Sequence, residues 1–362
     1  MNILIITFQG DYSGATNSIT YLSEGLANKG HNVYVGCRVE SLLYKNLENS
    51  RAKLIPMTFT GKLDRVNMRQ IRDAVKTYNI ELINAQSSQD RYTSILAKWI
   101  YKLNVKIVHT RRQTPLSIGG WFQNQFYVKG TNKIVTVSNE LKKTFVKKGI
   151  PENHISVIFN GTPAEKFKHV KEEDIQILRK KFNISENEVV IGCVSRMKKQ
   201  DQLIRAMAYL DPSYTVMFVG VEPGSLDALA RELNIKNRIL YAGIVDSKSV
   251  ISYYPLFKVD ILPSTSDGFG LVLVEAMAMG TPVIGTRYEG IIDVIEDGES
   301  GFLFEDGNSK DLAEKIERVL TDQALREKFI ANGKIAALQK FSMERTIGEY
   351  EKLFAELIDK GN

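Results

Sequence analysis

A loop rich in serine, aspartate and glycine separates an apolar run at residues 259–262 from a stretch with helical periodicity. The end of this loop and the first residue of the expected helix are Asp267, Gly268, Phe269, Gly270 and Leu271. Glycines let backbone amides approach a ligand closely, and a helix start attracts anions such as a diphosphate. Glu275, about one and a half turns into the helix, is placed to accept two ribose hydroxyls. The alternative is a plain strand–turn–helix with a surface glutamate, which a Gly-x-Gly pair alone would favour.

A second candidate is the basic loop that follows the apolar run at 189–194. It contains Arg196, Lys198 and Lys199. Cations at the carboxyl end of a strand suit a diphosphate leaving group, whose negative charge grows in the transition state. Alternatively, this segment is a solvent-exposed basic loop that binds no ligand. Either lysine could act with Arg196.

One histidine of the four, His109, ends an expected strand, at 106–109, and so lies at the edge where ligands bind. A lone histidine is more often structural. Arg111 and Arg112 follow it, and they would either receive a phosphate-bearing acceptor or form surface salt bridges.

Near the start of the chain, a turn after the run at 3–7 contains Gly10 and Gly14. A first βα turn commonly needs glycine, so this signal has low specificity. The turn lacks Gly-x-Gly-x-x-Gly, which argues against a nicotinamide-dinucleotide site.

The elements that must position these residues alternate short β-branched runs with amphipathic stretches, a pattern typical of parallel α/β architecture. Expected strands lie at 3–7, 33–37, 53–56, 82–84, 106–109, 133–137 and 155–158, and then at 189–194, 215–219, 238–241, 259–262 and 282–285. We therefore predict two Rossmann-like, doubly wound parallel-sheet domains that face a central cleft. The expected domains are 1–165 and 166–340, and a C-terminal helix within 341–362 is expected to pack back on the first domain.

Length and composition agree with this organisation. A chain of 362 residues is longer than a single domain with one hydrophobic core usually is, which favours two domains. The two cysteines lie in apolar runs, which indicates that their thiols are buried. Because no apolar run is long enough to span a bilayer and no secretory leader is visible, we expect a cytoplasmic protein. Residues 1–165 hold 22 Lys and Arg against 11 Asp and Glu, whereas the remainder holds 26 against 31. The basic first half predicts peripheral contact with an anionic membrane, or simply a solvated surface; no nucleic-acid-binding motif is present.

Taken together, these motifs resemble the retaining glycosyltransferases of family 4, which have the GT-B fold, over nearly the full chain. In that family an acidic residue and a glutamate eight positions later bracket a Gly-Phe-Gly loop. The resemblance implies that Glu275 binds the ribose of a nucleotide-sugar donor and that Asp267, where glutamate is usual, binds the donor sugar. It also implies that Arg196 and Lys198 clamp the diphosphate, that an amide near Gly14 reaches the donor phosphate, and that His109 contacts the donor sugar.

The resemblance further implies transfer with retention to a glycan or lipid-linked acceptor, in surface polysaccharide, lipopolysaccharide or glycolipid assembly. We expect no cofactor and no metal, because no cluster has metal-ligand spacing and cations can meet the phosphate charge. The alternatives are a GT-B epimerase or phosphorylase and a non-enzymatic sugar-nucleotide-binding protein. The sequence does not identify the nucleotide, the donor sugar, the acceptor or the oligomeric state.

Overall fold

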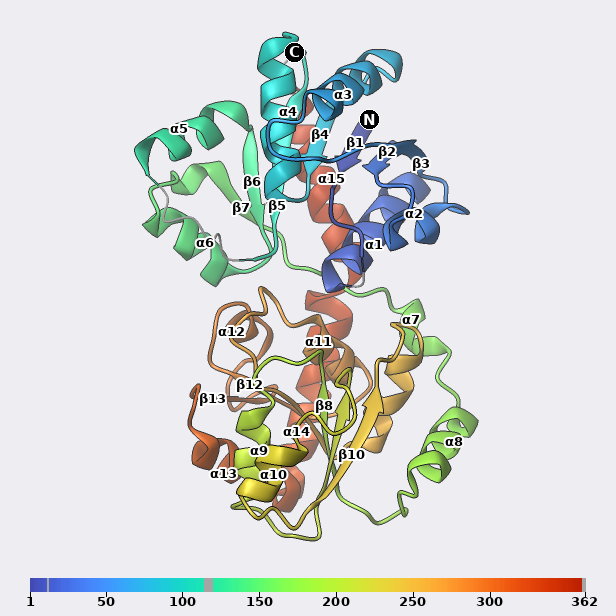
Figure 1. The fold of residues 1–362 in the computed structure, drawn as a ribbon, viewed down its shortest axis with the longest axis vertical. Coiled ribbons are helices and arrows are strands. Elements are labelled where there is room, and N and C mark those ends of the chain that lie inside the picture. The colour runs from blue at the N-terminus through green and yellow to red at the C-terminus, as the bar shows by residue number, and fades with distance from the viewer. Residues whose placement is uncertain (12, 114–119, 360–362) are drawn as a thin grey trace. The chain divides into compact units, whose positions relative to one another are not determined.

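The computed structural model describes residues 1–11, 13–113 and 120–359. The chain forms two compact units, one of Met1–Gly161 with Met343–Asn362 and the other of Thr162–Ser342 (Figure 1). Within unit 2, the Thr162 N–H donates to the Phe341 carbonyl at 3.1 Å, so the beginning and the end of this unit lie side by side.

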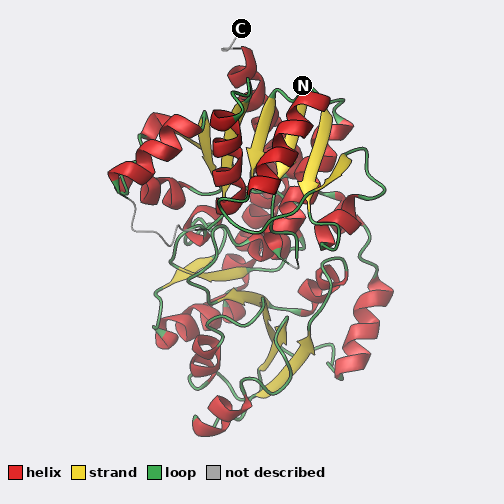
Figure 2. Ribbon diagram, turned by 45° about the horizontal axis from the view of Figure 1, so that its top comes forward, coloured by secondary structure: helices red, strands yellow, loops and turns green. Residues whose placement is uncertain are grey.

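Unit 1 is built on a seven-stranded parallel sheet with the order β3-β2-β1-β4-β5-β6-β7. Figure 2 shows the strands of the protein in yellow and the helices in red. Its strands are β1 (Asn2–Ile6), β2 (Asn32–Cys37), β3 (Lys53–Pro56), β4 (Leu82–Ala85), β5 (Lys106–Arg111), β6 (Lys133–Thr136) and β7 (Ile155–Val157). Its helices are α1 (Gly14–Asn28), α2 (Leu42–Leu47), α3 (Arg65–Thr77), α4 (Ser88–Ile100), α5 (Trp121–Gly130), α6 (Asn139–Lys147), a 3₁₀ turn at Glu152–His154, and α15 (Met343–Asp359).

Helices cover both faces of this sheet. One core cluster joins β1 and β2 to α1, α2 and α15, while another joins the opposite face to α3 and α4. Tyr350 and Phe354 of α15 are fully buried in the first cluster. The C-terminal helix is therefore part of the unit 1 core.

Unit 2 has a six-stranded parallel sheet with the order β10-β9-β8-β11-β12-β13. Its strands are β8 (Val190–Val194), β9 (Thr215–Val219), β10 (Arg238–Gly243), β11 (Val259–Leu262), β12 (Val283–Thr286) and β13 (Phe302–Phe304). Its helices are α7 (Glu165–Lys168), α8 (Glu172–Phe182), α9 (Asp201–Met207), α10 (Asp227–Glu232), η2 (Ser249–Leu256), α11 (Leu271–Ala278), α12 (Ile291–Val294), α13 (Ser309–Thr321), α14 (Gln323–Ile335) and η3 (Ala336–Lys340).

The predicted fold class, two Rossmann-like parallel-sheet domains, is confirmed. The strands are nearly continuous apolar runs because helices bury both faces of a parallel sheet. The sequence did not reveal β13, α2, α7 or α8.

Candidate functional site

The site in unit 2 lies where the strand order reverses. β8 is paired with β9 on one side and with β11 on the other. The loop after β8 leads to α9, which packs in the core cluster on one face of the sheet, whereas the loop after β11 leads to α11, which lies outside that cluster and packs on η2. The two loops therefore diverge and leave the carboxyl ends of β8 and β11 open to a ligand. Both motifs singled out in the sequence follow these two strands.

The loop after β11 is held in place by backbone packing. Gly270 has φ of +82°, a conformation that favours glycine, and it directly precedes α11. A Cβ at Gly290 would lie 2.0 Å from the carbonyl oxygen of Gly268. Phe269 is buried and meets Phe341 edge-on, with ring centroids 5.3 Å apart. These contacts fix the loop that carries Asp267.

The loop after β8 brings one lysine to Asp267. The Lys198 Nζ forms an ion pair with Asp267 Oδ2, whereas Lys199 pairs with Asp306 at 2.7 Å. The buried side chain of Gln200 holds the loop, since its amide donates to the Arg196 carbonyl at 2.9 Å. Arg196 itself is exposed and forms no ion pair with any residue that the structure describes. The structure therefore places Lys198, of the two lysines left open by the sequence, beside Asp267.

Glu275 lies on α11 and is almost buried. Its Oε1 accepts from Lys166 Nζ at 2.5 Å, and its Oε2 accepts from the Tyr254 hydroxyl at 3.3 Å. Lys166, on the short helix α7, is a site residue that the sequence analysis missed, because it lies 109 positions from Glu275 and in no motif. Burial raises the pKa of Tyr254 well above its usual range, and the Glu275 charge adds to this effect. Tyr254 is therefore a neutral hydrogen-bond donor to the carboxylate.

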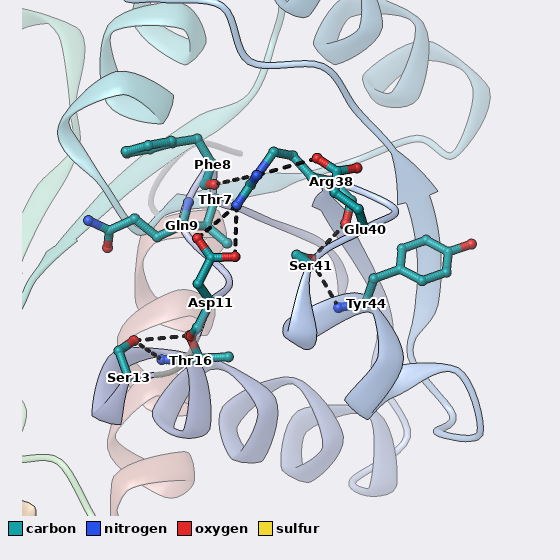
Figure 3. Close-up of polar contacts among 10 residues, drawn as sticks. All are labelled: Thr7, Phe8, Gln9, Asp11, Ser13, Thr16, Arg38, Glu40, Ser41 and Tyr44. Carbon is teal, nitrogen blue, oxygen red and sulfur yellow. Dashed lines mark hydrogen bonds and ion pairs between the residues drawn. The ribbon is translucent and has the colours of Figure 1, made fainter. Parts of the chain in front are cut away.

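In unit 1, the predicted glycine, Gly14, is the first residue of α1, directly after the turn that follows β1. Figure 3 shows the polar contacts of Asp11, Ser13 and Thr16 around this turn. Ser13 is the N-cap of α1 and accepts from the Thr16 N–H at 3.2 Å. A Cβ at Gly14 would meet nothing within 4 Å, so packing alone does not require glycine there. Asp11, the nearest carboxylate to this turn, binds Arg38 through both oxygens, at 3.1 and 3.0 Å. Asp11 therefore forms an exposed ion pair with Arg38.

His109 is fully buried on β5. Its Nδ1 accepts from Arg91 Nη1 at 3.1 Å, so the proton of the neutral ring lies on Nε2. This Nε2 makes no well-aligned hydrogen bond with a described residue, although the backbone of Ser87 lies near enough to favour the protonated ring. Burial, followed by the charges of Arg91 and Arg111, lowers the pKa of His109 well below its usual range. The imidazole is therefore neutral at physiological pH.

No group of three or more His, Cys, Asp or Glu side chains is arranged to hold a metal ion in the described parts of the chain. Over the same residues, no helix combines the length and the apolar character needed to cross a membrane. Both cysteines, Cys37 and Cys193, are free and buried.

Two family models match consecutive parts of this chain. The model for Glycosyltransferase Family 4 matches residues 12–166, and the model for Glycosyl transferases group 1 matches residues 174–336. Between them they account for most of the sequence and for both Rossmann-like units. The chain therefore belongs to this family of glycosyltransferases, as the motifs indicated.

Individual relatives agree with this assignment. N-acetyl-alpha-D-glucosaminyl L-malate synthase of Bacillus anthracis is 26% identical over 275 residues, which cover 73% of this chain and 71% of the relative. The capsular polysaccharide biosynthesis glycosyltransferase CapM of Staphylococcus aureus is 29% identical over 238 residues, or 61% of this chain and 60% of CapM. Like CapM, other relatives are matched over less than two thirds of their own length.

Among solved structures, Anabaena Alr3699/HepE in complex with UDP-glucose superposes with a TM-score of 0.81 at 22% identity, covering 98% of this chain and 100% of that one. The likeness shows that the fold is GT-B.

Proposed function

We propose that this protein transfers a sugar from a nucleoside-diphosphate sugar to a hydroxyl group of an acceptor, with retention of the anomeric configuration. The observation that carries the proposal is the arrangement in unit 2. Two carboxylates, Asp267 and Glu275, lie in and after a glycine loop at the strand-order reversal, and the cations Lys198 and Arg196 follow the adjacent strand. HepE, which has the same fold, has been solved with UDP-glucose, and this supports a nucleotide-sugar donor.

Each of these side chains is proposed to bind one part of the donor. Glu275 accepts hydrogen bonds from the ribose hydroxyls, and Lys166 and Tyr254 hold its carboxylate in position. Arg196, Lys198 and backbone amides of the glycine loop bind the diphosphate without a divalent ion, and an amide near Gly14 reaches a donor phosphate. Asp267 accepts from the hydroxyls of the donor sugar.

The chemical step follows from the retention that we propose. The acceptor hydroxyl attacks the anomeric carbon on the face from which the diphosphate departs, and the departing phosphate takes the hydroxyl proton. Negative charge grows on the diphosphate, so Arg196 and Lys198 stabilise the transition state more than the ground state. The ion pair between Asp11 and Arg38 is consistent with a mechanism that uses no separate carboxylate base.

His109 is proposed to donate its Nε2–H to a hydroxyl of the donor sugar. The Nε2, which makes no well-aligned hydrogen bond with a described residue, and the neutral ring support this role, because a neutral imidazole donates without adding charge near the reacting centre. The side chain is fully buried, so the proposal also requires that Nε2 become accessible when substrate binds.

The acceptor is proposed to be a glycan or a lipid-linked glycan in surface polysaccharide, lipopolysaccharide or glycolipid assembly, in line with the name of CapM.

We further propose that unit 1 contacts an anionic membrane from the cytoplasmic side. Trp121 and Phe122 are 68% and 83% exposed at the start of α5, and Lys129 and Lys147 are exposed on α5 and the neighbouring helix α6. Sedimentation with anionic vesicles should exceed that with neutral ones and fall in Phe122→Ser; equal sedimentation would contradict the membrane contact.

Donor binding tests the central proposal. Thermal unfolding with UDP, GDP and ADP sugars identifies the nucleotide, since a ligand at about 100 times its Kd stabilises by about 2.7 kcal/mol. Glu275→Gln keeps the shape of the side chain but removes its charge, so donor affinity should fall about tenfold or more. Glu314→Gln, an exposed position on α13, is the matched control. Unchanged donor affinity in Glu275→Gln would refute the site.

Product analysis separates the competing functions. Transfer to an acceptor with the anomeric configuration of the donor supports the proposal, whereas inversion contradicts it. Formation of an altered sugar nucleotide without acceptor would indicate an epimerase. Donor binding with no turnover over a wide acceptor panel would indicate a binding protein.

A further inference from the structure

The turn between β13 and α13 is tied to the loop that carries Arg196 and Lys198. The carboxylate of Asp306, in this turn, accepts from the Lys199 Nζ through both oxygens, at 2.9 and 2.7 Å. Its Oδ1 also accepts from the side-chain amide of Gln202 at 3.0 Å. Lys199 directly follows Lys198, so Asp306 holds the end of the loop that bears the two cations.

The Asp306 turn is itself firmly held. The Gly307 N–H donates to Gln202 Oε1 at 2.6 Å, so the amide of Gln202 bonds the turn through both its oxygen and its nitrogen. Asn308 caps α13 by accepting from the Asp311 N–H at 3.0 Å. Behind the turn, α9 and α13 pack side by side in the core of unit 2 (Figure 1). Asp306 is therefore anchored to the rigid part of this unit.

The loop after β8 is also held at its beginning and middle, by uncharged groups. The side-chain amide of Gln200 donates to the Ser195 hydroxyl at 2.8 Å and accepts from the Lys198 N–H at 2.5 Å. A Cβ at Gly220 would lie 2.9 Å from the Ser195 carbonyl oxygen, so β9 is followed by backbone that lies against this loop. Asp306 adds an ion pair at the end of the loop, which leaves Lys198 between fixed points.

The ion pair of Asp306 has little value apart from this geometry. The side chains of Lys199 and Asp306 are 41% and 38% exposed, and exposed ion pairs contribute little to stability because water screens them. By charge alone, a carboxylate at the border of a diphosphate site would repel the ligand. Placement of the loop is the effect that remains.

We propose that Asp306 is a positioning residue that, through Lys199, holds the loop of the two cations in the geometry that binds the donor diphosphate. The inference rests on the proposed function, in which Arg196 and Lys198 bind that diphosphate. The same pairing engages Lys199, so that Asp267 binds Lys198 instead. Asp306 therefore also decides which of the two adjacent lysines serves the donor site.

Two substitutions of opposite charge separate positioning from electrostatics. Asp306→Asn removes a negative charge and Lys199→Met removes a positive one, and both abolish the ion pair. Calorimetry measures the Kd of whichever of UDP, GDP and ADP binds the wild type most tightly. A misplaced cation loses about one charge-assisted hydrogen bond, so both variants should bind this diphosphate about tenfold more weakly. If charge alone mattered, Asp306→Asn would bind it more tightly and Lys199→Met more weakly.

Thermal unfolding and a matched ion pair provide the controls. The melting temperature of both variants should stay close to that of the wild type, because the pair is exposed. Glu299→Gln breaks a pair with Lys328 that has the same length, 2.7 Å, and comparable exposure elsewhere in unit 2, and it should leave the Kd unchanged. Lys199→Arg keeps an ion pair with Asp306 and should retain most of the affinity.

The outcomes separate this inference from the donor proposal. Unless both Asp306→Asn and Lys199→Met lose affinity, the positioning role is wrong and the donor site stands. A lower melting temperature with wild-type affinity shows a purely structural pair and overturns the role as well. Should Asp306→Asn fail to fold, equal affinities of Lys199→Met and Lys199→Arg would contradict it. A wild type that binds none of the three diphosphates overturns the donor site itself, and the role of Asp306 with it.

Discussion

Gly290 lies outside every motif, and a substitution there tests whether packing fixes the loop that carries Asp267. A Cβ added there would lie 2.0 Å from the Gly268 carbonyl oxygen, 2.4 Å from its carbonyl carbon and 2.7 Å from the Phe269 Cα. All three atoms are backbone, so no flexible side chain can move aside. To bring the closest contact to 3.0 Å, the shortest that real Cβ atoms tolerate, the loop must retreat by about 1 Å.

The expected effect has a stability part and a functional part. Overpacking a buried position costs about 1–3 kcal/mol, so Gly290→Ala should lower the free energy of unfolding by that amount. The displaced segment adjoins Asp267 and leads into α11, and a misplacement of about 1 Å in a catalytic site can lower turnover roughly 100-fold. We therefore expect kcat/KM for the donor to fall far more than stability alone explains.

Urea unfolding and steady-state transfer kinetics measure these two parts separately. Gly348→Ala is the control, because its Cβ would meet nothing within 4 Å and the substitution lies in α15 of unit 1. Gly290→Ala with wild-type stability and wild-type kcat/KM would refute the claim that this contact sets the loop.

Three further predictions concern charge. Arg196→Ala should lower kcat more than it raises KM, because diphosphate charge grows in the transition state; an increase in KM alone would show simple binding. Burial raises the pKa of Asp90 to about 7, so the unfolded chain releases this proton first as pH rises from about 4 to 7. Stability should decline over that window, and Asp90→Asn, whose Oδ1 can still accept from Phe8, should flatten the decline in Tm; an unaltered pH profile would contradict the assignment. Burial lowers the pKa of His154 to about 4, so protonation of the unfolded chain should destabilise the protein as pH falls from about 6.5 to 4. His154→Gln should remove part of that acid sensitivity, as measured by Tm against pH.

Elements with a strong apolar signature were predictable. The strands at Lys53–Pro56, Thr215–Val219 and Val259–Leu262 match the expected bounds. β13 was missed because Phe302–Phe304 is a three-residue edge strand, too short for a periodic pattern. α8 was missed because it buries none of its residues and is rich in charge. Three acidic residues in its first turn and three basic residues in its last stabilise it through the helix dipole, and Phe182 at its end lies against Tyr253 of η2.

The sequence by itself determined the alternation of strands and helices and the glycine loop before Glu275, because both depend on local periodicity and turn chemistry. The residue types alone left both Lys198 and Lys199 open, and only the resemblance to the family favoured Lys198. Tertiary structure pairs Lys198 with Asp267, and it brought Lys166 to Glu275 from 109 positions away. It also made Gly290 a constraint on Gly268, because only packing between separate segments creates that contact.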